Sequence, residues 1–177
     1  MGALRSTDGS QIRARRLRLR APHPLVRSPK GGRLLSALQL PWFATLPPRG
    51  FGVITVTGRR SGKARRKCVR AIRAGDKAYL VAIGGPKAAW RKNVAANPRV
   101  SLRLRGGWSP GVVRAPQDGA EAGEAMAAFC RTVNPFDYVE CCVHRRGRPT
   151  RAKIVELHRA WFDGGTPLIV DLQGEVP

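Results

Sequence analysis

The chain has 177 residues, which is long enough to bury a hydrophobic core in one domain and short for two domains. Its 33 lysine and arginine residues exceed its 11 aspartate and glutamate residues, and the formal net charge of +22 indicates an anionic partner without constraining the fold. No stretch approaches the roughly 18 to 20 consecutive apolar residues of a membrane-spanning helix, so the sequence predicts none.

The N-terminal segment, residues 1–33, is rich in arginine, contains the single acid Asp8 and shows almost no apolar periodicity. This composition predicts a disordered basic arm, and it lacks the apolar run of a secretory signal. Residues 34–43 form a short amphipathic segment, which we expect to pack over one end of a barrel; contact with a membrane surface is the alternative. The expected organisation is a basic arm over 1–33 and one domain over 34–177.

A sheet is predicted to begin after this segment, with strands over 51–57, 65–73 and 77–83. The first strand stops at Gly58, and Gly75-Asp76 makes a tight turn between the second and the third. Residues 88–96 predict a helix that ends at Asn97-Pro98, because the residue before a proline is pushed out of the helical region. An alternating strand over 100–105 follows, and Gly106-Gly107 turns the chain into another strand from Trp108.

The C-terminal part is predicted to be mainly helical. Asp118 and Glu121 have the spacing of a capping box, and Asn134 is placed to cap a further helix. A helix with one apolar face over 154–162 carries His158, which we expect to be a satisfied core histidine, and 167–172 reads as a closing strand. The elements together predict an α+β fold, a mostly antiparallel barrel with flanking helices.

The four cysteines form no CxxC pair, which favours a reduced cytoplasmic location, either free or peripheral to the membrane. Cys141, Cys142 and His144 lie close in sequence, but a zinc site needs a second ligand pair at suitable spacing. We therefore predict no metal site and interpret these thiols as small buried side chains of a helix.

Two glycine-containing segments carry the chemistry. The first, residues 57–67, combines glycines that permit positive φ with arginines whose forked donors suit a phosphate or carboxylate, and its turn is a candidate anion-binding nest. A solvated basic hairpin turn looks the same. The second, residues 83–98, places Gly84 and Gly85 before a helix whose free N–H groups form another anion site. Trp90 in that helix is either a core residue or a stacking platform.

The order of these landmarks resembles that of the deazaflavin-dependent nitroreductase and quinone reductase family. The landmarks are TGRRSGKAR, a Gly-Asp turn, a GG loop, then W-x-x-N-x-x-ANP and an alternating strand. The resemblance covers roughly 43–172 and implies a split β-barrel like that of FMN-binding proteins, with the deazaflavin coenzyme F(420) bound. Position by position, it implies cofactor contacts from a first loop and strand and from a second loop and helix: Gly58, Arg59, Arg60, Ser61, Gly62, Arg65, Lys67 and Cys68, then Gly84, Gly85 and Asn93.

The chain departs from the family pattern at two places. Ala82-Ile83 stands where the family often has Ser-Lys, and we expect Lys87 to substitute for the lost contact. The aromatic pattern that lines the family's substrate pocket is represented by Pro135, Phe136 and Tyr138, and it precedes a helical insertion over 144–161. The implied activity is hydride transfer to a quinone, enone or nitro compound, with Tyr138 as a candidate proton donor.

Two alternatives stay open at this stage. The sequence pI of about 11.7 and the basic arm fit a nucleic-acid-binding module, although the absence of a known reading motif disfavours a nucleic-acid partner. An FMN-binding split-barrel oxidoreductase, or a cofactor carrier, would differ mainly in the ring bound, which makes FMN the second candidate cofactor. The sequence is compatible with a homodimer and does not decide it.

Overall fold

A computed structural model describes residues 39–174 as a closed, antiparallel barrel of six strands in the order β1-β2-β3-β6-β5-β4. The strands are β1 (Phe51–Thr57), β2 (Ala64–Ala74), β3 (Lys77–Ala82), β4 (Arg99–Leu104), β5 (Gly107–Arg114) and β6 (Thr166–Leu172). The expected α+β class and antiparallel barrel are confirmed, and the expected strand bounds agree to within two residues. The predicted arm over 1–33 lies outside the described residues.

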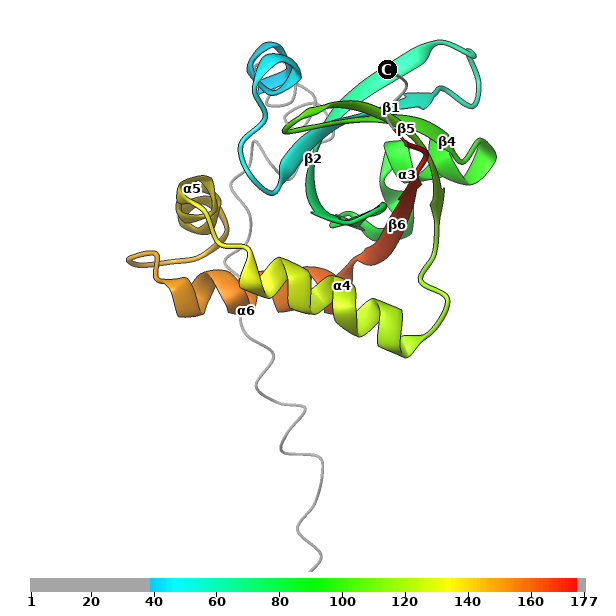
Figure 1. The fold of residues 1–177 in the computed structure, drawn as a ribbon. Coiled ribbons are helices and arrows are strands. Elements are labelled where there is room, and N and C mark those ends of the chain that lie inside the picture. The colour runs from blue at the N-terminus through cyan, green and yellow to red at the C-terminus, as the bar shows by residue number, and fades with distance from the viewer. Residues whose placement is uncertain (1–38, 175–177) are drawn as a thin grey trace, which may run out of the picture.

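Helices flank the barrel (Figure 1). They are the 3-10 turn η1 (Gly85–Lys87), α3 (Ala89–Ala96), α4 (Gly119–Arg131), α5 (Pro135–His144) and α6 (Arg151–Gly164), and a helical segment over 39–45 precedes β1. Figure 1 looks almost along the barrel axis, with α4, α5 and α6 gathered on one side. No helix among the described residues is long and apolar enough to cross a membrane.

The barrel interior is filled by alternate residues of its strands, because successive side chains of a strand point to opposite faces. The interior cluster includes Ile54, Val56, Val69, Ala71, Leu80, Leu102, Leu104, Leu168 and Val170. Val94 of α3 belongs to the same cluster and Trp90 packs against it, so α3 closes one end of the barrel. Of the two interpretations of Trp90, packing against the core is the one that fits this position.

A second cluster joins the outer faces of β3 and β6 to α4 and α6. The predicted apolar face of α6 is confirmed, since Ile154, Leu157, Trp161 and Phe162 are all buried. The segment described as a helical insertion over 144–161 is therefore not an appendage. It consists of the end of α5, a short turn and most of α6, and α6 supplies part of the core.

The segment before β1 packs on the barrel through one ring. Phe43 is buried against Phe51 and Phe136, with centroid distances of 5.9 and 5.6 Å, whereas its neighbour Trp42 is 71% exposed. The guanidinium of Arg103 donates to the carbonyls of Ala44 and Thr45 at 3.1 and 2.8 Å, and so holds the C-terminal end of this helical turn. The expected packing is thus confirmed for Phe43, while residues 34–38 lie outside the described part.

Both predicted helix caps form, one of them differently from the expectation. The Asp118 side chain accepts from Glu121 N at 2.8 Å, but the Glu121 carboxylate accepts from Gln117 N and from Arg114 instead of completing the capping box. Asn134 makes the full box with Asp137. Glu121 is diverted because the two guanidinium donors of Arg114, each 2.7 Å from a carboxylate oxygen, offer charge-assisted bonds.

The register of β2 positions the candidate site. This strand pairs with β1 over Ala64–Arg70 and with β3 over Ala71–Ala74, so it passes from one neighbour to the other in its middle. Beyond Ala82, β3 gives way to η1 and α3. The first half of β2 and the turn that precedes it therefore lie on the side of the barrel where the second glycine loop leaves β3.

Candidate functional site

The turn between β1 and β2 is built around Gly58. The Gly58 N–H donates to the Lys63 carbonyl at 2.9 Å, and the Gly58 carbonyl accepts from Ser61 N at 3.2 Å and Gly62 N at 2.8 Å. A Cβ atom at position 58 would lie 2.9 Å from Ser61 Oγ, and Gly62 has a φ of +63°, so both positions favour glycine. The turn is consequently compact, and it leaves the side chains of Arg59 and Arg60 exposed.

The expected backbone nest does not form in this turn. The N–H groups of Ser61 and Gly62 are bonded within it, and the Arg59 N–H bonds to a side chain of α3. Successive amide groups are therefore not aimed together at an external anion. Anion binding at this turn depends instead on the exposed arginine side chains.

Asn93 connects the two glycine segments. Its Oδ1 atom accepts from the backbone N–H of Arg59 at 3.4 Å and from Arg59 Nη1 at 3.0 Å. Residues 34 positions apart in sequence are thus in direct contact. The acceptor of the Asn93 amide is used inside the protein, so this residue orients Arg59 in addition to any role toward a ligand.

The second glycine loop leads into α3 without a side-chain cap. Gly85 has a φ of +55° and its carbonyl accepts from Ala88 N at 3.1 Å. Ala88 occupies the N-cap position of α3, and it has no side chain that could bond the first-turn N–H groups. The first-turn N–H groups of α3 are therefore left without a side-chain cap, and the same helix contacts Arg59 through Asn93.

Lys67 and Cys68 point to opposite faces of the barrel wall. Lys67 pairs with Ile54, whose side chain lies in the barrel interior, whereas Cys68 packs with the outer cluster around Phe51. Burial lowers the pKa of Lys67 and raises the pKa of Cys68 to about 11, so this thiol is not a ready nucleophile at neutral pH. A planar ring on one face of the sheet would contact one of these two residues, not both.

Ala82 and Ile83, where the chain departs from the family pattern, lie in two different environments. Ala82 is fully buried in the barrel, while Ile83 is 47% exposed and Lys87 is exposed on η1. A side chain at position 82 would point into the barrel core. The position that could lose a cofactor contact is therefore 83, and Lys87 is a cation four residues further along the same loop.

Tyr138 lies on α5, which is fixed to β2 by a buried ion pair. Arg70 Nη1 bonds to Asp137 Oδ1, and Arg70 Nη2 donates to the Thr132 carbonyl at 2.5 Å. The Tyr138 side chain, next to this anchor, is 38% exposed. Arg70 is five residues from Arg65 on β2, or about 17 Å along an extended strand, so Tyr138 and the basic turn are not adjacent.

Two further ionisable groups are buried beside this ion pair. Among the residues that the structure describes, Glu140 Oε2 and both ring nitrogens of His158 have no hydrogen-bond partner within 3.5 Å, and His158 Nε2 lies 3.7 Å from Asp137 Oδ1. Burial raises the pKa of Glu140 to about 7 and lowers the pKa of His158. His158 is thus a core histidine, as expected, and its imidazole lies beside the Asp137 carboxylate.

The cysteine interpretation is half correct. Cys141 is buried on α5, whereas its neighbour Cys142 is exposed, because consecutive helix positions are 100° apart and only one of them faces the core. The sequence does not predict the Arg70–Asp137 pair. No local pattern marks it, since the partners lie 67 positions apart.

The profile of the F(420)H(2)-dependent quinone reductase family matches residues 43–140, which span β1 to most of α5 and both glycine loops. The chain belongs to this family. Its members are reductases that depend on the deazaflavin coenzyme F(420), so the family supports the prediction that the chain is an oxidoreductase. No match is found among the curated proteins.

Several solved structures are similar to this chain over about 70 to 80% of its length. A structure described as an F420-H2 dependent reductase, FDR-A, is 23% identical with a TM-score of 0.47, and 71% of this chain covers 95% of that one. A domain-swapped dimer is 24% identical over 69% of this chain and 80% of that one, with a TM-score of 0.46. A haem storage protein of Vibrio cholerae, HutZ, is 8% identical over 78% and 90%, with a TM-score of 0.50. The strand order of the structure and the family match together confirm the split β-barrel.

Proposed function

We propose that this family member is a reductase that takes a hydride from reduced coenzyme F(420) and delivers it to a small electrophile, a quinone, an enone or a nitro compound. The observation that carries the proposal is the contact of Arg59 with Asn93, which joins the basic turn to the helix after the second glycine loop. Both segments of the family pattern thereby border one region.

The residues of this region fit an anionic coenzyme. Between Gly58 and Cys68 the chain has six cationic side chains and no acid, and no ion pair involves Arg59, Arg60 or Arg65 among residues 39–174. Phosphate and carboxylate groups are the partners that unpaired guanidinium forks favour. Arg59, Arg60, Ser61 and Arg65 would hold these groups, with Gly58 and Gly62 shaping the turn.

The second loop would supply the opposite wall. Gly84 and Gly85 allow close approach of a ligand, Lys87 adds a cation, and Asn93 keeps Arg59 in place. Either Lys67 or Cys68 would line the wall, according to the face used. The bound coenzyme supplies the hydride, and the protein orients it, excludes water and holds a proton, for which the exposed hydroxyl of Tyr138 is our candidate.

A coenzyme titration tests the proposal. The full chain is titrated with F(420) at low ionic strength, using the change in coenzyme fluorescence, and Arg60→Gln and Arg65→Gln are compared with Arg159→Gln on the exposed face of α6. Loss of one charge-assisted bond should weaken binding about tenfold for each turn variant, and the control should stay within about twofold. Equal effects of all three variants, or no binding, would refute the proposed site.

The alternative cofactor is tested in parallel. FMN is titrated against the same four proteins, and the proposal requires F(420) to bind more tightly. A Tyr138→Phe variant then addresses the proton. If the hydroxyl donates it, kcat falls with KM nearly unchanged and the alkaline limb of the pH profile moves, whereas a packing role would leave the profile in place.

A further inference from the structure

A cavity of about 570 Å³ opens at the end of the barrel away from the Gly58 turn. Its walls come from the first residues of β1, the last residues of β2 and β4, and the chain between α4 and α5. The Gly58 turn joins the opposite ends of β1 and β2. This volume is typical of sites for small molecules, about 300 to 1,000 Å³, and the cavity is separate from the region assigned to the coenzyme.

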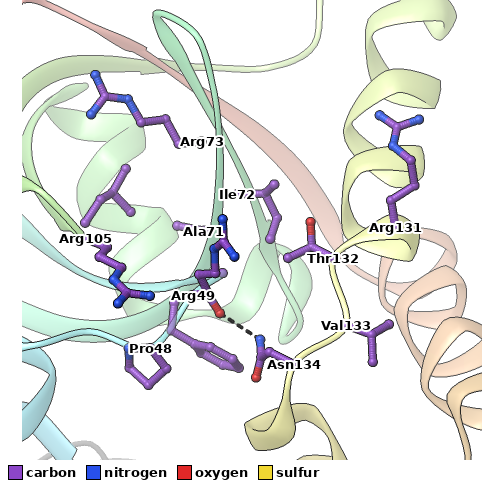
Figure 2. Close-up of a pocket in the computed structure, with 13 residues that line it drawn as sticks. Pro48, Arg49, Ala71, Ile72, Arg73, Arg105, Arg131, Thr132, Val133 and Asn134 are labelled. Atoms are coloured by element: carbon purple, nitrogen blue, oxygen red, sulfur yellow. Dashed lines mark hydrogen bonds between the residues drawn. The ribbon is translucent and has the colours of Figure 1, made fainter.

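Four arginines line this cavity. Arg49 lies shortly before β1, Arg73 is the penultimate residue of β2, Arg105 follows β4 and Arg131 ends α4, so the four cations come from four separate parts of the chain (Figure 2). No aspartate or glutamate among residues 39–174 lines it. Over residues 39–174, none of the four takes part in an ion pair.

The lining is preformed by contacts of its backbone. Asn134 Nδ2 donates to the Arg49 carbonyl at 2.7 Å, the dashed line in Figure 2, and ties the turn before β1 to the start of α5. Gly50, with a φ of +77°, accepts from Ala71 N at 3.0 Å. The walls that carry Arg49 and Arg73 are therefore held together before any ligand binds, which lowers the entropic cost of binding.

The four arginine side chains are exposed and therefore accessible to a ligand. Within the described residues, the single hydrogen bond from any of their guanidinium groups is that of Arg73 Nε to the carbonyl of Gly75, at 3.3 Å. A dianion or trianion in the cavity would accept charge-assisted hydrogen bonds from these guanidinium groups and would offset the local positive charge.

We propose that this cavity binds a small polyanion that carries two or more phosphate or carboxylate groups. Arg49, Arg73, Arg105 and Arg131 would bond its charged groups, and Ala71 and Leu104 would contact its carbon skeleton. The site is distinct from the proposed coenzyme site and does not depend on it. Its occupant is a second ligand of the protein.

The test uses two probes on the full chain, pyrophosphate for phosphates and citrate for carboxylates. Backbone amide signals of Gly50, Ala71, Arg73 and Arg105 are followed by NMR during each titration at constant ionic strength. We expect saturable shifts at these amides with at least one probe, and the probe that saturates at the lower concentration identifies the chemistry of the ligand.

Charge variants decide between a site and general attraction. Arg73→Gln/Arg105→Gln should weaken binding about tenfold or more, whereas Arg151→Gln/Arg159→Gln, which removes two exposed charges from α6, should change it less than about twofold. Arg49→Gln/Arg131→Gln removes the other pair and provides the same test if the first variant fails to fold. Arg60→Gln/Arg65→Gln should leave the shifts intact.

Three results would overturn the site. They are shifts spread evenly over all exposed arginines without saturation, shifts confined to residues 58–65, and unchanged binding by folded variants that lack either arginine pair. A negative result here would leave the coenzyme titration unaffected, because the two experiments monitor opposite ends of the barrel.

Discussion

Replacement of Asp137 by alanine should be the most destabilising single change among the polar residues described here. The Asp137 and Arg70 side chains are 1% and 2% exposed, and the Arg70 guanidinium lies between the rings of Phe51 and Phe129, at 5.2 and 5.3 Å from their centroids. Asp137 also accepts from Asn134 N at 2.7 Å and so completes the cap of α5. The substitution removes both interactions and leaves a buried cation without its partner.

The magnitude follows from these two losses. Removal of one partner of a buried ion pair costs about 3 to 5 kcal/mol, and loss of a helix cap about 1 kcal/mol, although the two overlap here. We expect a decrease of about 4 kcal/mol in the free energy of unfolding. With a urea m-value of about 2 kcal/mol/M, the denaturation midpoint should fall by about 2 M.

Urea denaturation followed by tryptophan fluorescence measures this effect. Asp163→Ala, which removes an exposed acid near the end of α6, is the matched control and should stay within about 0.5 kcal/mol of the native protein. Asp137→Asn serves if the alanine variant does not fold, and its cost should be smaller because one oxygen acceptor remains. Arg70→Met/Asp137→Leu removes both members of the ion pair, so at least half of the loss should be recovered. A cost for Asp137→Ala within about 1 kcal/mol of the control would refute the reasoning.

Other predictions concern single positions. Glu140 has a folded pKa of about 7, above its ordinary value of 4.5, so its contribution to stability is lost as pH rises from about 5 to 7. Urea unfolding at pH 5.5, 7 and 8.5 should therefore show a flatter dependence of stability on pH for Glu140→Gln than for the native protein. The lowered pKa of His158 makes stability rise with pH, the opposite of the Glu140 effect. The test is therefore the difference in stability between the native protein and Glu140→Gln at each pH. Gly123→Ala should raise the melting temperature and add about 0.5 to 1 kcal/mol to the free energy of unfolding, because position 123 lies within α4 and has open space around its Cβ. Gly50→Ala should lower the melting temperature, because position 50 has a φ of +77° and its Cβ would lie 3.1 Å from a neighbouring side chain. Asn93→Ala should weaken F(420) binding about fivefold in the fluorescence titration, because it frees Arg59 without removing a charge; unchanged affinity would count against the role of this contact.

Local patterns were sufficient to predict the elements of this barrel. The β-branched residues of 51–57, the turn at Gly75-Asp76 and the alternation over 100–105 all correspond to observed strands and turns. The Asn134 cap and the apolar face of α6 were also predictable, because each depends on residues within one or two helical turns. These signals depend only on residues close together in the chain, so a single sequence is enough to detect them.

Long-range electrostatics were not predictable in the same way. The sequence shows that Arg49, Arg73, Arg105 and Arg131 are basic, but only the closure of the barrel brings them around one cavity. The Arg70–Asp137 pair depends likewise on where α5 crosses β2. In a chain with a net charge of +22, composition does not show which arginines form ion pairs and which do not.

The difference between the expected and the observed Gly58 turn bears on how the family motif works. A nest of backbone amides would hold an anion without help from side chains, and substitution of its arginines would then cost little. In this protein the amides of Ser61 and Gly62 stabilise the turn itself, and Asn93 fixes Arg59 from the neighbouring helix. The glycines therefore shape the turn while the arginines provide the binding energy, so affinity for an anionic coenzyme should depend steeply on salt and on arginine number, and weakly on changes that preserve the turn.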